Sequence, residues 1–577
     1  MSLSKREKSI DRSLAIPAVI AITLLSTGAA SMIYEVALIR EFTILLGSSF
    51  YSGAIVLSAI MGGLAIGSFL IGRLSDRVKN PFLLLFILEM LIAIISLFIV
   101  PVTRGFALSD EWMLTDVIIS TFKLVGLSPT SWHILLIYSS GILLIPAILM
   151  GGELPVAIKI LLKSDTRRIG EVTGFAYFLD TIGGIFGAIS AGIIMIPLIG
   201  SIRTVHIGGI LNTIGATSVA FYIFFLARKM GQGMGKIPYD GPIGEKDLRL
   251  KVFLLIAIVL ILPALFTWGY LQADELEYTT TLDLYSGQMI LDQRQSKFQT
   301  ITVVEHNILG RVLFLDGKEQ ISESDDEPYS EALVLPAMVT MLGNRDEPID
   351  VLLIGGGDLG CLEVLTRFSD DDLKSVTLVD LDPEVIEVSK EYFKSIHNDS
   401  WKDDRLEYIA MDGRKYVRDA IRNHREYDII ILDLPDPNDD LLATFYSLEF
   451  YLELYQLLSE DGIIATQATQ ADWALGADGF VVIANTLEAS DFPVVRMYTQ
   501  YVPSFGNWGF AIASKRYDPI QMTESDIDDL LEDVDTNTYD GKVHLFLFAL
   551  PPWLERDINE GLQLINTIDR PIIIREY

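Results

Sequence analysis

With 577 residues, half of them hydrophobic, the chain is too long for a single domain and too apolar for an ordinary soluble protein. Its 44 Lys and Arg against 76 Asp and Glu give a formal net charge of −32, which argues against nucleic-acid binding because the carboxylates would repel phosphates. The only cysteine, Cys361, excludes an intrachain disulfide and a cysteine metal cluster.

Charge divides the chain into two parts. Residues 1–273 hold 21 Lys and Arg and 16 Asp and Glu, a net charge of +5, whereas residues 274–577 hold 23 and 60, a net charge of −37. The two parts must therefore occupy different surroundings. The acidic part suits cationic ligands or a high-salt cytoplasm, and most of its carboxylates are expected to be ordinary solvated surface.

The first part is predicted to form an α-helical multi-span membrane bundle. Several runs reach the about twenty apolar residues that a bilayer crossing needs. The first run is not a cleaved signal peptide, because no small-residue cleavage site ends it and further spans follow. The predicted helices cover residues 13–33, 51–72, 82–101, 133–152, 174–199, 203–227 and 251–271.

Charged residues inside or beside these helices are candidates for function, because charge in a membrane is expensive. The structural alternative is that they fix packing or topology, and the functional one is a transport or lipid site. They are Glu35, Arg40 and Glu41 after the first helix, Glu89 in the third, Glu153 after the fourth and Asp180 in the fifth.

The second part begins with β-rich runs at 278–285, 296–304 and 311–317, which predict a small antiparallel sheet, followed by a helix at 327–342. From residue 350 onward strands and helices alternate, which is typical of a Rossmann-like parallel sheet wrapped by helices. We therefore divide the chain into a membrane domain at 1–273, a β-rich domain at 274–345 and a nucleoside-binding domain at 346–577.

The individual elements follow from the apolar runs. The predicted strands are 351–354, 376–379, 406–410, 428–432, 462–467, 494–500 and 508–514, and the predicted helices are 359–367, 383–394, 413–423 and 446–459. The tail at 516–577 is predicted to add a packing helix and a strand.

A glycine-rich turn is the strongest local signal. The strand at 351–354 runs into Gly355-x-Gly357-x-x-Gly360, and the next predicted strand ends in Asp380. Such a turn followed by an acid at a strand end holds a nucleoside, with the carboxylate accepting from ribose hydroxyls; the bland alternative is a merely tight turn. Acids recur at the carboxyl ends of the predicted strands, where ligands bind in such folds. They are Asp358, Asp380, Asp412, Asp433 and Asp436.

Seven motifs in order resemble the spermidine synthase family of aminopropyltransferases, over about residues 278–515. They lie at 296–299 (SKFQ), 315–320 (LDGKEQ), 326–331 (DEPYSE), 354–360 (IGGGDLG), 379–382 (VDLD), 411–413 (MDG) and 427–437 (YDIIILDLPDP). The apolar first part, with 47–51 (GSSFY) and 502–509 (VPSFGNWG), is similar to the membrane-fused branch of that family.

The resemblance implies transfer of an aminopropyl group from decarboxylated S-adenosylmethionine to an amine such as putrescine. The products are spermidine and methylthioadenosine, and no metal is needed. By match to the motifs, Asp433 accepts the proton of the attacking amine and Asp436 positions that amine. Gln320 and Tyr329 line the acceptor channel. Each has a bland alternative, as a strand end or turn for the two acids and as packing for the other two.

The donor side follows from the same match. Asp358 pairs with the donor's own amine and Asp380 holds the ribose hydroxyls, beside the turn of Gly355 and Gly357. Asp412 and the backbone of Gly413 face the adenine, although an Asp-Gly pair is also an ordinary turn. Gln299 contacts the nucleoside.

The sequence departs from the family pattern mainly on the acceptor side. Ser330 stands where a histidine is usual, and 438–440 (NDD) replaces a small turn that contains proline. Leu359 replaces a small residue, and Asp380 stands where glutamate is commoner. The identity of the amine is therefore open.

Two other functions compete with this interpretation. One is a methyl- or aminocarboxypropyl-transferase that uses S-adenosylmethionine on a lipid or another amine. The other is a non-catalytic polyamine sensor or transporter, motivated by Glu153 and Asp180. Asp358 discriminates between donors, because it would repel a donor carboxylate. The pair Asp433 and Asp436 favours catalysis.

Partners and location are expectations of the same kind. We expect a small cationic amine as substrate, membrane lipids around the bundle, no nucleic acid, and either a monomer or a homo-oligomer. Basic clusters at 5–12, 73–79, 159–168 and 228–251 mark one side of the cell membrane as cytoplasmic. Seven crossings would then place the acidic part outside, whereas a nucleoside substrate favours the cytoplasm, where we expect it. A re-entry at 34–50 or a surface-lying helix at 251–271 would reconcile the two.

Overall fold

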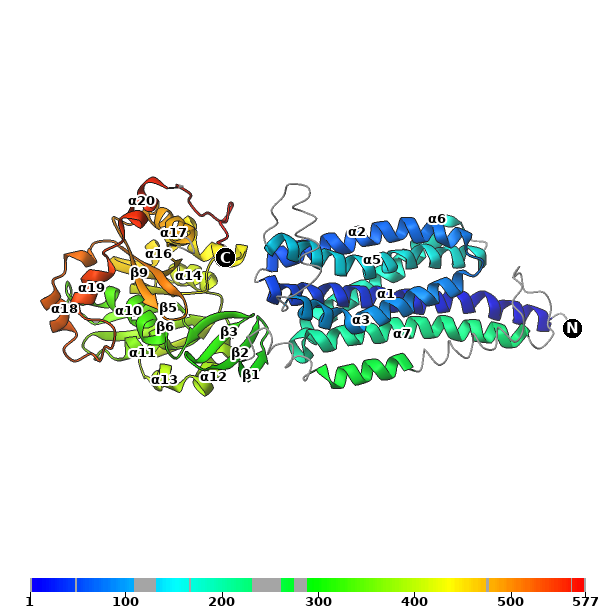
Figure 1. Cartoon of the computed structure of the whole chain (residues 1–577), viewed down its shortest axis with the longest axis horizontal. Coiled ribbons are helices and arrows are strands. Elements are labelled where there is room, and N and C mark those ends of the chain that lie inside the picture. The colour runs from blue at the N-terminus through cyan, green and yellow to red at the C-terminus, as the bar shows by residue number, and fades with distance from the viewer. Residues whose placement is uncertain are drawn as a thin grey trace. The chain divides into compact units, whose positions relative to one another are not determined.

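The computed structural model describes residues 3–46, 49–107, 131–164, 168–230, 261–273, 288–473, 477–561 and 563–574. It consists of two compact units, Met1–Gly287 and Gln288–Tyr577, and each is described by itself (Figure 1).

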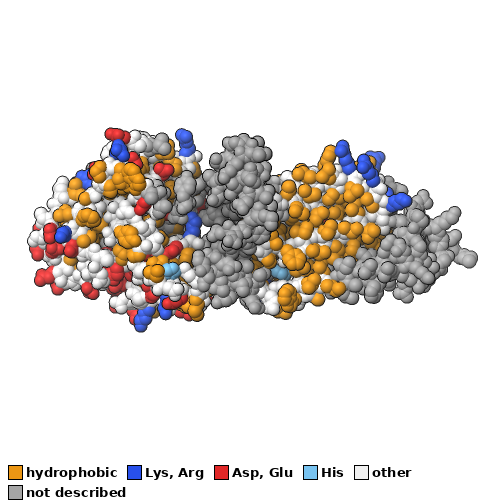
Figure 2. Space-filling view, in the orientation of Figure 1, with side chains coloured by type: hydrophobic (Ala, Val, Ile, Leu, Met, Phe, Trp, Pro, Cys, Tyr) orange, Lys and Arg blue, Asp and Glu red, His pale blue; other side chains and the backbone are white. Residues whose placement is uncertain are grey.

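The first unit is built of long apolar helices that lie alongside one another (Figure 1). Five of its helical segments are long and apolar enough to cross a membrane by length and composition. Hydrophobic side chains cover much of its visible surface (Figure 2). The helices are α1 (Leu3–Leu46), α2 (Ser49–Arg77), α3 (Pro81–Ala107), α5 (Ser131–Ser164), α6 (Ile169–Ile189) and α7 (Ile196–Met230), with the π-helix η1 (Ser190–Met195) between the last two.

Glycines bring two pairs of these helices into backbone contact. A Cβ atom on Gly67 of α2 would lie 1.9 Å from the carbonyl oxygen of Ile148 in α5. A Cβ atom on Gly183 of α6 would lie 2.3 Å from the carbonyl oxygen of Leu25 in α1. Only glycine permits this approach, which is a common way for helices to pack in membranes.

Two of the predicted helix ends, those of the first and fourth helices, are wrong. Helix α1 continues to Leu46, so Glu35 and Glu41 lie inside it and are buried in the bundle. Glu153 likewise lies inside α5, which runs on to Ser164. The predicted break between the fifth and sixth helices, after residue 199, is confirmed by Gly200, whose φ of 78° and ψ of 169° are not helical. Of the seventh, only 261–271 lies within the described residues.

The second unit opens with a four-stranded antiparallel meander. Its strands pair in chain order, β1 with β2, β2 with β3 and β3 with β4. The run at 278–285 lies outside the described residues, and β1 and β4 were not predicted. The strands are β1 (Met289–Gln295), β2 (Thr300–His306), β3 (Gly310–Leu315) and β4 (Lys318–Ser322), and α10 (Asp326–Leu342) follows them.

A seven-stranded sheet forms the body of this unit, in the order β10-β11-β9-β8-β5-β6-β7. The five strands from β9 to β7 are parallel, β11 is antiparallel to β9, and the edge strand β10 is antiparallel to β11 and so runs in the same direction as the five. The strands are β5 (Ile349–Gly355), β6 (Leu373–Asp380), β7 (Leu406–Ala410), β8 (Tyr427–Asp433), β9 (Leu458–Gln470), β10 (Val494–Val502) and β11 (Gly506–Ser514).

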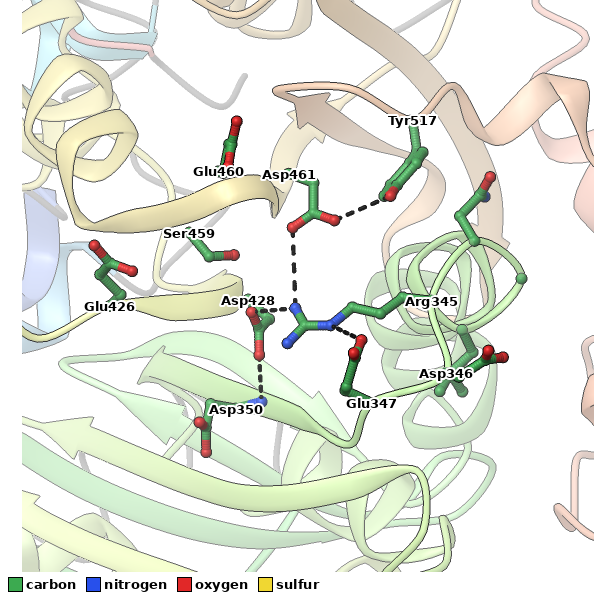
Figure 3. A pocket seen from close by; sticks show the side chains of 13 residues that line it. Arg345, Asp346, Glu347, Asp350, Glu426, Asp428, Ser459, Glu460, Asp461 and Tyr517 are labelled. Carbon is green, nitrogen blue, oxygen red and sulfur yellow. Dashed lines mark hydrogen bonds and ion pairs between the residues drawn. The ribbon is translucent and has the colours of Figure 1, made fainter.

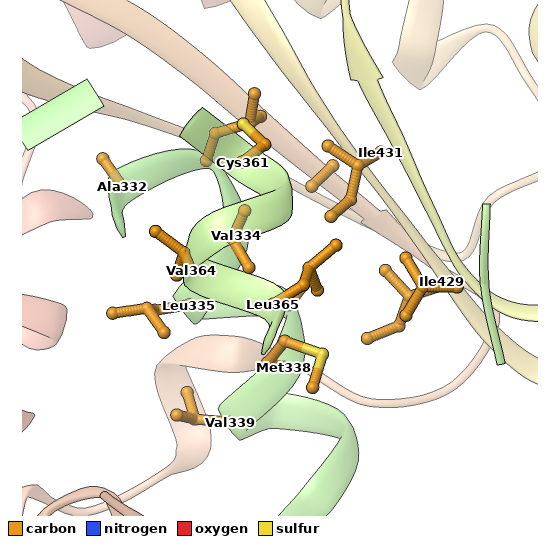
Figure 4. Close-up of a cluster of buried hydrophobic side chains, with 14 of the residues drawn as sticks. Ala332, Val334, Leu335, Met338, Val339, Cys361, Val364, Leu365, Ile429 and Ile431 are labelled. Atoms are coloured by element: carbon orange, nitrogen blue, oxygen red, sulfur yellow. The ribbon is translucent and has the colours of Figure 1, made fainter. Parts of the chain in front are cut away.

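Helices cover both faces of this sheet. The main ones are α11 (Gly360–Thr366), α12 (Pro383–Tyr392), α14 (Gly413–Arg422), α16 (Leu448–Leu457) and α17 (Asp478–Glu488). On one face α10 and α11 pack against β8, through residues such as Met338, Leu365 and Ile429 (Figure 4). On the other face α14, α16 and α17 form a second core.

The tail differs from its prediction. It holds the helices α18 (Glu524–Leu530), α19 (Gly541–Leu547) and α20 (Pro552–Glu560), and within the described residues it adds an isolated bridge, Thr567 to Arg570, in place of the predicted strand. The apolar run after residue 542 is interrupted by Pro551 and Pro552, which favour a helix start over a continuous strand.

The order of the strands places the site. Strand β5 is flanked by β6 on one side and β8 on the other, so the connections leave β5 and β8 in opposite directions. In doubly wound sheets, ligands bind at the carboxyl ends of two neighbouring strands whose connections diverge in this way. The carboxyl ends of β5, β6, β7 and β8, with the loops after them, carry the acids that the sequence singled out.

Candidate active site

The glycine turn after β5 lies directly against β8. A Cβ atom on Gly355 would lie 1.8 Å from the carbonyl oxygen of Asp433, and the N–H of Gly356 donates to that oxygen at 3.0 Å. Gly355 and Gly356 have φ angles of 84° and 72°, which favour glycine. Leu359 adopts a φ of 75° without that freedom. The turn therefore brings its backbone within reach of the acid at the end of β8.

Asp433 has one satisfied and one open carboxylate oxygen. The hydroxyl of Tyr329 on α10 donates to Oδ1 at 2.9 Å. Oδ2 is shielded from solvent and has no hydrogen-bond partner within the described part of the chain. Burial, followed by the nearby charge of Asp358, raises the pKa of Asp433 to about 7, although the Tyr329 hydrogen bond opposes the shift. An acid with such a pKa exchanges a proton near neutral pH.

Asp436 is fixed by a small hydrogen-bond network. The side-chain amide of Gln467, at the end of β9, donates to Asp436 Oδ1 at 3.0 Å and to the Leu434 carbonyl at 2.9 Å. The hydroxyl of Tyr446 donates to the same carbonyl at 3.1 Å. This network holds the loop after β8 in one shape.

Asp358 and Asp380 complete the acids around the turn. Asp358 Oδ1 accepts from the N–H of Gly360 at 2.9 Å, and Asp380 Oδ1 accepts from the N–H of Asp382 at 2.8 Å. A Cβ atom on Gly357 would lie 2.9 Å from Asp380 Oδ2, so the turn touches this acid as well. Burial raises the pKa of Asp358, and it raises the pKa of Asp380 to about 6.

Asp326, at the start of α10, is a further acid of the site that the sequence analysis did not single out. Its Oδ1 accepts from the hydroxyl of Ser330 at 3.0 Å and lies 2.4 Å from where a Cβ of Gly360 would be. Burial, and then the charge of Asp358, raise the pKa of Asp326 to about 8. The signal was present, because Asp326 opens the motif at 326–331.

We call Asp326, Asp358, Asp380 and Asp433 the acid cluster. Within the described residues no Lys, Arg or His lies within ion-pair distance of these carboxylates, whereas other buried acids of this unit, such as Glu331 and Asp428, are paired with arginines. Buried carboxylates without a cation are costly, so this arrangement fits a cationic ligand.

The other residues predicted on the donor side are Gln299, in the β1–β2 loop, and Asp412 and Gly413, at the start of α14. Gln299 donates to Asp382 Oδ2 at 3.2 Å, as Ser296 does at 2.6 Å, so the β1–β2 loop is fastened to the end of β6. Asp412 caps α14 by accepting from the N–H of Lys415 at 2.9 Å. A Cβ on the next residue, Gly413, would lie 2.6 Å from the Ile354 side chain.

The hydrogen bonds of Gln320 do not connect it to the acids of the site. Its side-chain amide donates to the carbonyls of Lys318 and Glu319 in its own strand β4, at 3.3 and 3.1 Å. Two residues that sequence reasoning missed, Gln467 and Tyr446, contact the acidic loop instead. Gln467 is the last residue of the predicted strand 462–467, which is the position that could have identified it.

A pocket of about 910 Å³ lies elsewhere, at the amino ends of β5 and β8 (Figure 3). Acids such as Asp346 and Asp461 line it, but Arg345 occupies its centre and pairs with Asp428 at 2.5 Å and with Glu347 at 3.2 Å. Because Arg345 pairs with the acids at its centre and the glycine turn is at the other edge of the sheet, this pocket is not the active site.

Comparisons with known proteins agree with the motifs. The family model for the spermine/spermidine synthase domain matches residues 327–525. A polyamine aminopropyltransferase 2 of Hyperthermus butylicus is 37% identical over 300 residues, which cover 50% of this chain and 94% of that protein.

Two further relatives extend the comparison. A polyamine aminopropyltransferase of Oceanobacillus iheyensis is 29% identical over 487 residues, covering 80% of this chain and 83% of that protein. An alignment of that length extends into the helical unit. The crystal structure of spermidine synthase from Thermotoga maritima is similar at 27% identity and a TM-score of 0.41, covering 47% of this chain and 87% of that one.

Two substitutions should move the pKa of Asp433 in opposite directions. Tyr329→Phe removes a hydrogen bond to the carboxylate, so the pKa should rise. Asp358→Asn removes a neighbouring negative charge, so the pKa should fall. Infrared titration of the carboxyl band, assigned with Asp433→Asn, measures both shifts. Shifts of the same sign in the two variants would contradict this description of the site.

Proposed function

Because this chain belongs to the spermine/spermidine synthase family of polyamine aminopropyltransferases, we propose that it is a membrane-bound transferase that converts a diamine such as putrescine into spermidine. The observation that carries this proposal is the acid cluster, whose buried or half-buried carboxylates have no ion-pair partner among the described residues and lie around a nucleoside-type glycine turn. The donor is decarboxylated S-adenosylmethionine, which is a sulfonium with an additional ammonium group.

The charge of the cluster matches this donor better than the alternative. S-adenosylmethionine carries a carboxylate, which Asp358 and Asp326 would repel, whereas the decarboxylated molecule presents only positive charge there. Asp358 pairs with the donor ammonium. Asp380 accepts from the ribose hydroxyls, and Gly357 leaves room for the nucleoside beside it.

The reaction is a displacement at the carbon next to sulfur. The amine nitrogen forms the new bond to this carbon while the carbon–sulfur bond breaks, and its electron pair stays on sulfur, so methylthioadenosine leaves as a neutral molecule. The amine must be neutral to attack, and Asp433 takes its proton through the open Oδ2 oxygen. Tyr329 holds the other oxygen, which orients the carboxylate.

Asp436 and the Gln467 network hold the acceptor. The second cation of a diamine needs a carboxylate some distance from the reacting nitrogen, and the loop after β8 supplies one in a fixed position. Gln320 and Tyr329 line the acceptor channel in this proposal. Ser330, whose hydroxyl donates to Asp326, takes the place of the usual histidine. The range of amines that the enzyme accepts therefore has to be measured.

Attachment to the membrane is supported by the helical unit. Its five candidate spans expose large apolar side chains to the surroundings, as at Phe186, Ile193 and Leu198. Contact of such an apolar surface with lipid tails is favourable, whereas its contact with water is not (Figure 2). We place the catalytic unit on the cytoplasmic side, because its charged nucleoside donor does not cross a bilayer unaided.

The catalytic assignment predicts the effect of removing the proton acceptor. Full-length protein supplied with the decarboxylated donor and a panel of diamines should release methylthioadenosine and an aminopropylated amine. Asp433→Asn should lower kcat by at least about a hundredfold, the usual scale for a positioned general base. Asp346→Asn, at the opposite edge of the sheet, is the matched control and should keep full activity. Unchanged turnover in Asp433→Asn would refute the role.

The cytoplasmic placement predicts a labelling pattern. The chain's only cysteine, Cys361, is buried, so a cysteine introduced at the exposed Asp529 reports sidedness cleanly. A membrane-impermeant maleimide should label Asp529→Cys only after permeabilisation. Asp76→Cys, in the last turn of α2 and within the basic cluster at 73–79, should behave identically. Labelling of Asp529→Cys in intact cells would place the catalytic unit outside.

A further inference from the structure

Polar side chains from five helices meet inside the helical unit. The hydroxyl of Tyr34 on α1 donates to Asn212 Oδ1 on α7 at 2.7 Å, and Asn212 Nδ2 donates to Glu89 Oε2 on α3 at 3.0 Å. Glu153 on α5 interacts electrostatically with both Glu89 and Asp180 on α6. We call these five residues the polar centre.

Two oxygen atoms of the polar centre are open. Glu89 is fully buried and Glu153 is 6% exposed, yet Oε1 of each has no hydrogen-bond partner within the described residues. Over the same residues, no Lys, Arg or His lies within ion-pair distance of Glu89, Glu153 or Asp180; Lys159 pairs instead with Asp76. The polar centre is therefore acidic, shielded and unmatched, which is expensive at membrane depth.

The polar centre lies where transport sites are built. Glu89 and Glu153 are within a few residues of the midpoints of their spans, Pro81–Thr103 and Ser140–Lys163. The surrounding helices are interrupted, because Pro155 follows Glu153 in α5 and the α6–α7 path passes through a π-helix and the non-helical Gly200. Substrate sites of secondary transporters lie near the midplane and use discontinuous helices of this kind.

The spacing of the acids favours an elongated organic cation over a metal ion. Among the described residues no three His, Cys, Asp or Glu side chains are close enough together to hold one metal ion, so the three acids are spread out. A polyamine has ammonium groups separated by methylenes, which suits spread carboxylates. The adjoining cavity beside Tyr34 measures about 20 Å³, room for about one water molecule, so the helices must separate to admit the ligand.

We propose that the polar centre binds a protonated polyamine and that the helical unit moves it across the membrane. The choice of a polyamine rests on the function proposed above, whereas the cation site rests on the helices alone. Glu89 and Glu153 pair with the ammonium groups of the bound amine through their open oxygens, and Asp180 adds a third charge.

Flux through proteoliposomes tests this proposal. Full-length protein, with no decarboxylated donor present, should take up radiolabelled spermidine above protein-free vesicles. Glu89→Gln and Glu153→Gln should lower uptake by at least about tenfold, as the loss of a charge-assisted contact implies. Glu171→Gln, exposed on α6, is the matched control and should leave uptake unchanged. The Glu89 and Glu153 variants should still release methylthioadenosine in detergent, which separates this result from a failure of the catalytic assignment.

A measurement on the unaltered protein guards against misfolded variants. A hydrophobic carbodiimide modifies carboxyl groups inside membranes, and bound spermidine should slow its reaction with Glu89 and Glu153, as read by mass spectrometry. Spermidine uptake equal to that of protein-free vesicles, or modification unaffected by spermidine, would overturn the proposal. Flux of protons or sodium ions without spermidine would overturn the polyamine assignment.

Discussion

The close approach of the glycine turn to β8 is the constraint on which the catalytic unit depends. The Gly355 backbone lies against the Asp433 carbonyl, and the same turn carries Asp358 and touches Asp380. A side chain at Gly355 would clash with β8, and one at Gly357 would push Asp380 away. The glycines therefore hold several carboxylates close together, and no arginine or lysine of the described residues forms an ion pair with them.

Ionisation of these neighbouring carboxyl groups costs free energy, because they are shielded from water and repel one another. The pKa values of about 8 for Asp326 and about 7 for Asp433 lie above the usual range of aspartate, mainly because of burial. The folded chain thus binds more protons than the unfolded one at intermediate pH. Its stability is favoured below about pH 4, where both states are protonated, and declines as pH rises through about 7 and 8. A dicationic donor removes this penalty, so binding energy is available for positioning the reactants.

The sequence predicted the parallel strands of the catalytic unit and the location of its site. The alternation after residue 350 predicted strands β5 to β9, because buried parallel strands are continuous apolar runs. The glycine turn and the acids at strand ends identified the site's location. Gln467 and Tyr446 were missed because their role depends on the folded path of the loop after β8. Asp326 opens one of the sequence motifs, but its place beside the glycine turn depends on the packing of α10 against Gly360.

The helical unit was predicted in kind but less well in detail. Hydropathy indicated apolar helices, yet it ended the first helix before Glu35, because it cannot show that a charged residue will be buried among other helices. The convergence of Glu89, Glu153 and Asn212 from three helices has no local signature at all. Sequence patterns thus give the elements, and only packing reveals which polar groups meet.

The central claim is that the acid cluster binds a cationic donor. Isothermal titration calorimetry of the full-length protein with decarboxylated S-adenosylmethionine, in buffers of different ionisation enthalpy near neutral pH, tests it directly. The account predicts net release of protons on binding, because a nearby cation favours the ionised carboxylates. Binding that releases no protons, or equally tight binding of S-adenosylmethionine with its added carboxylate, would contradict it.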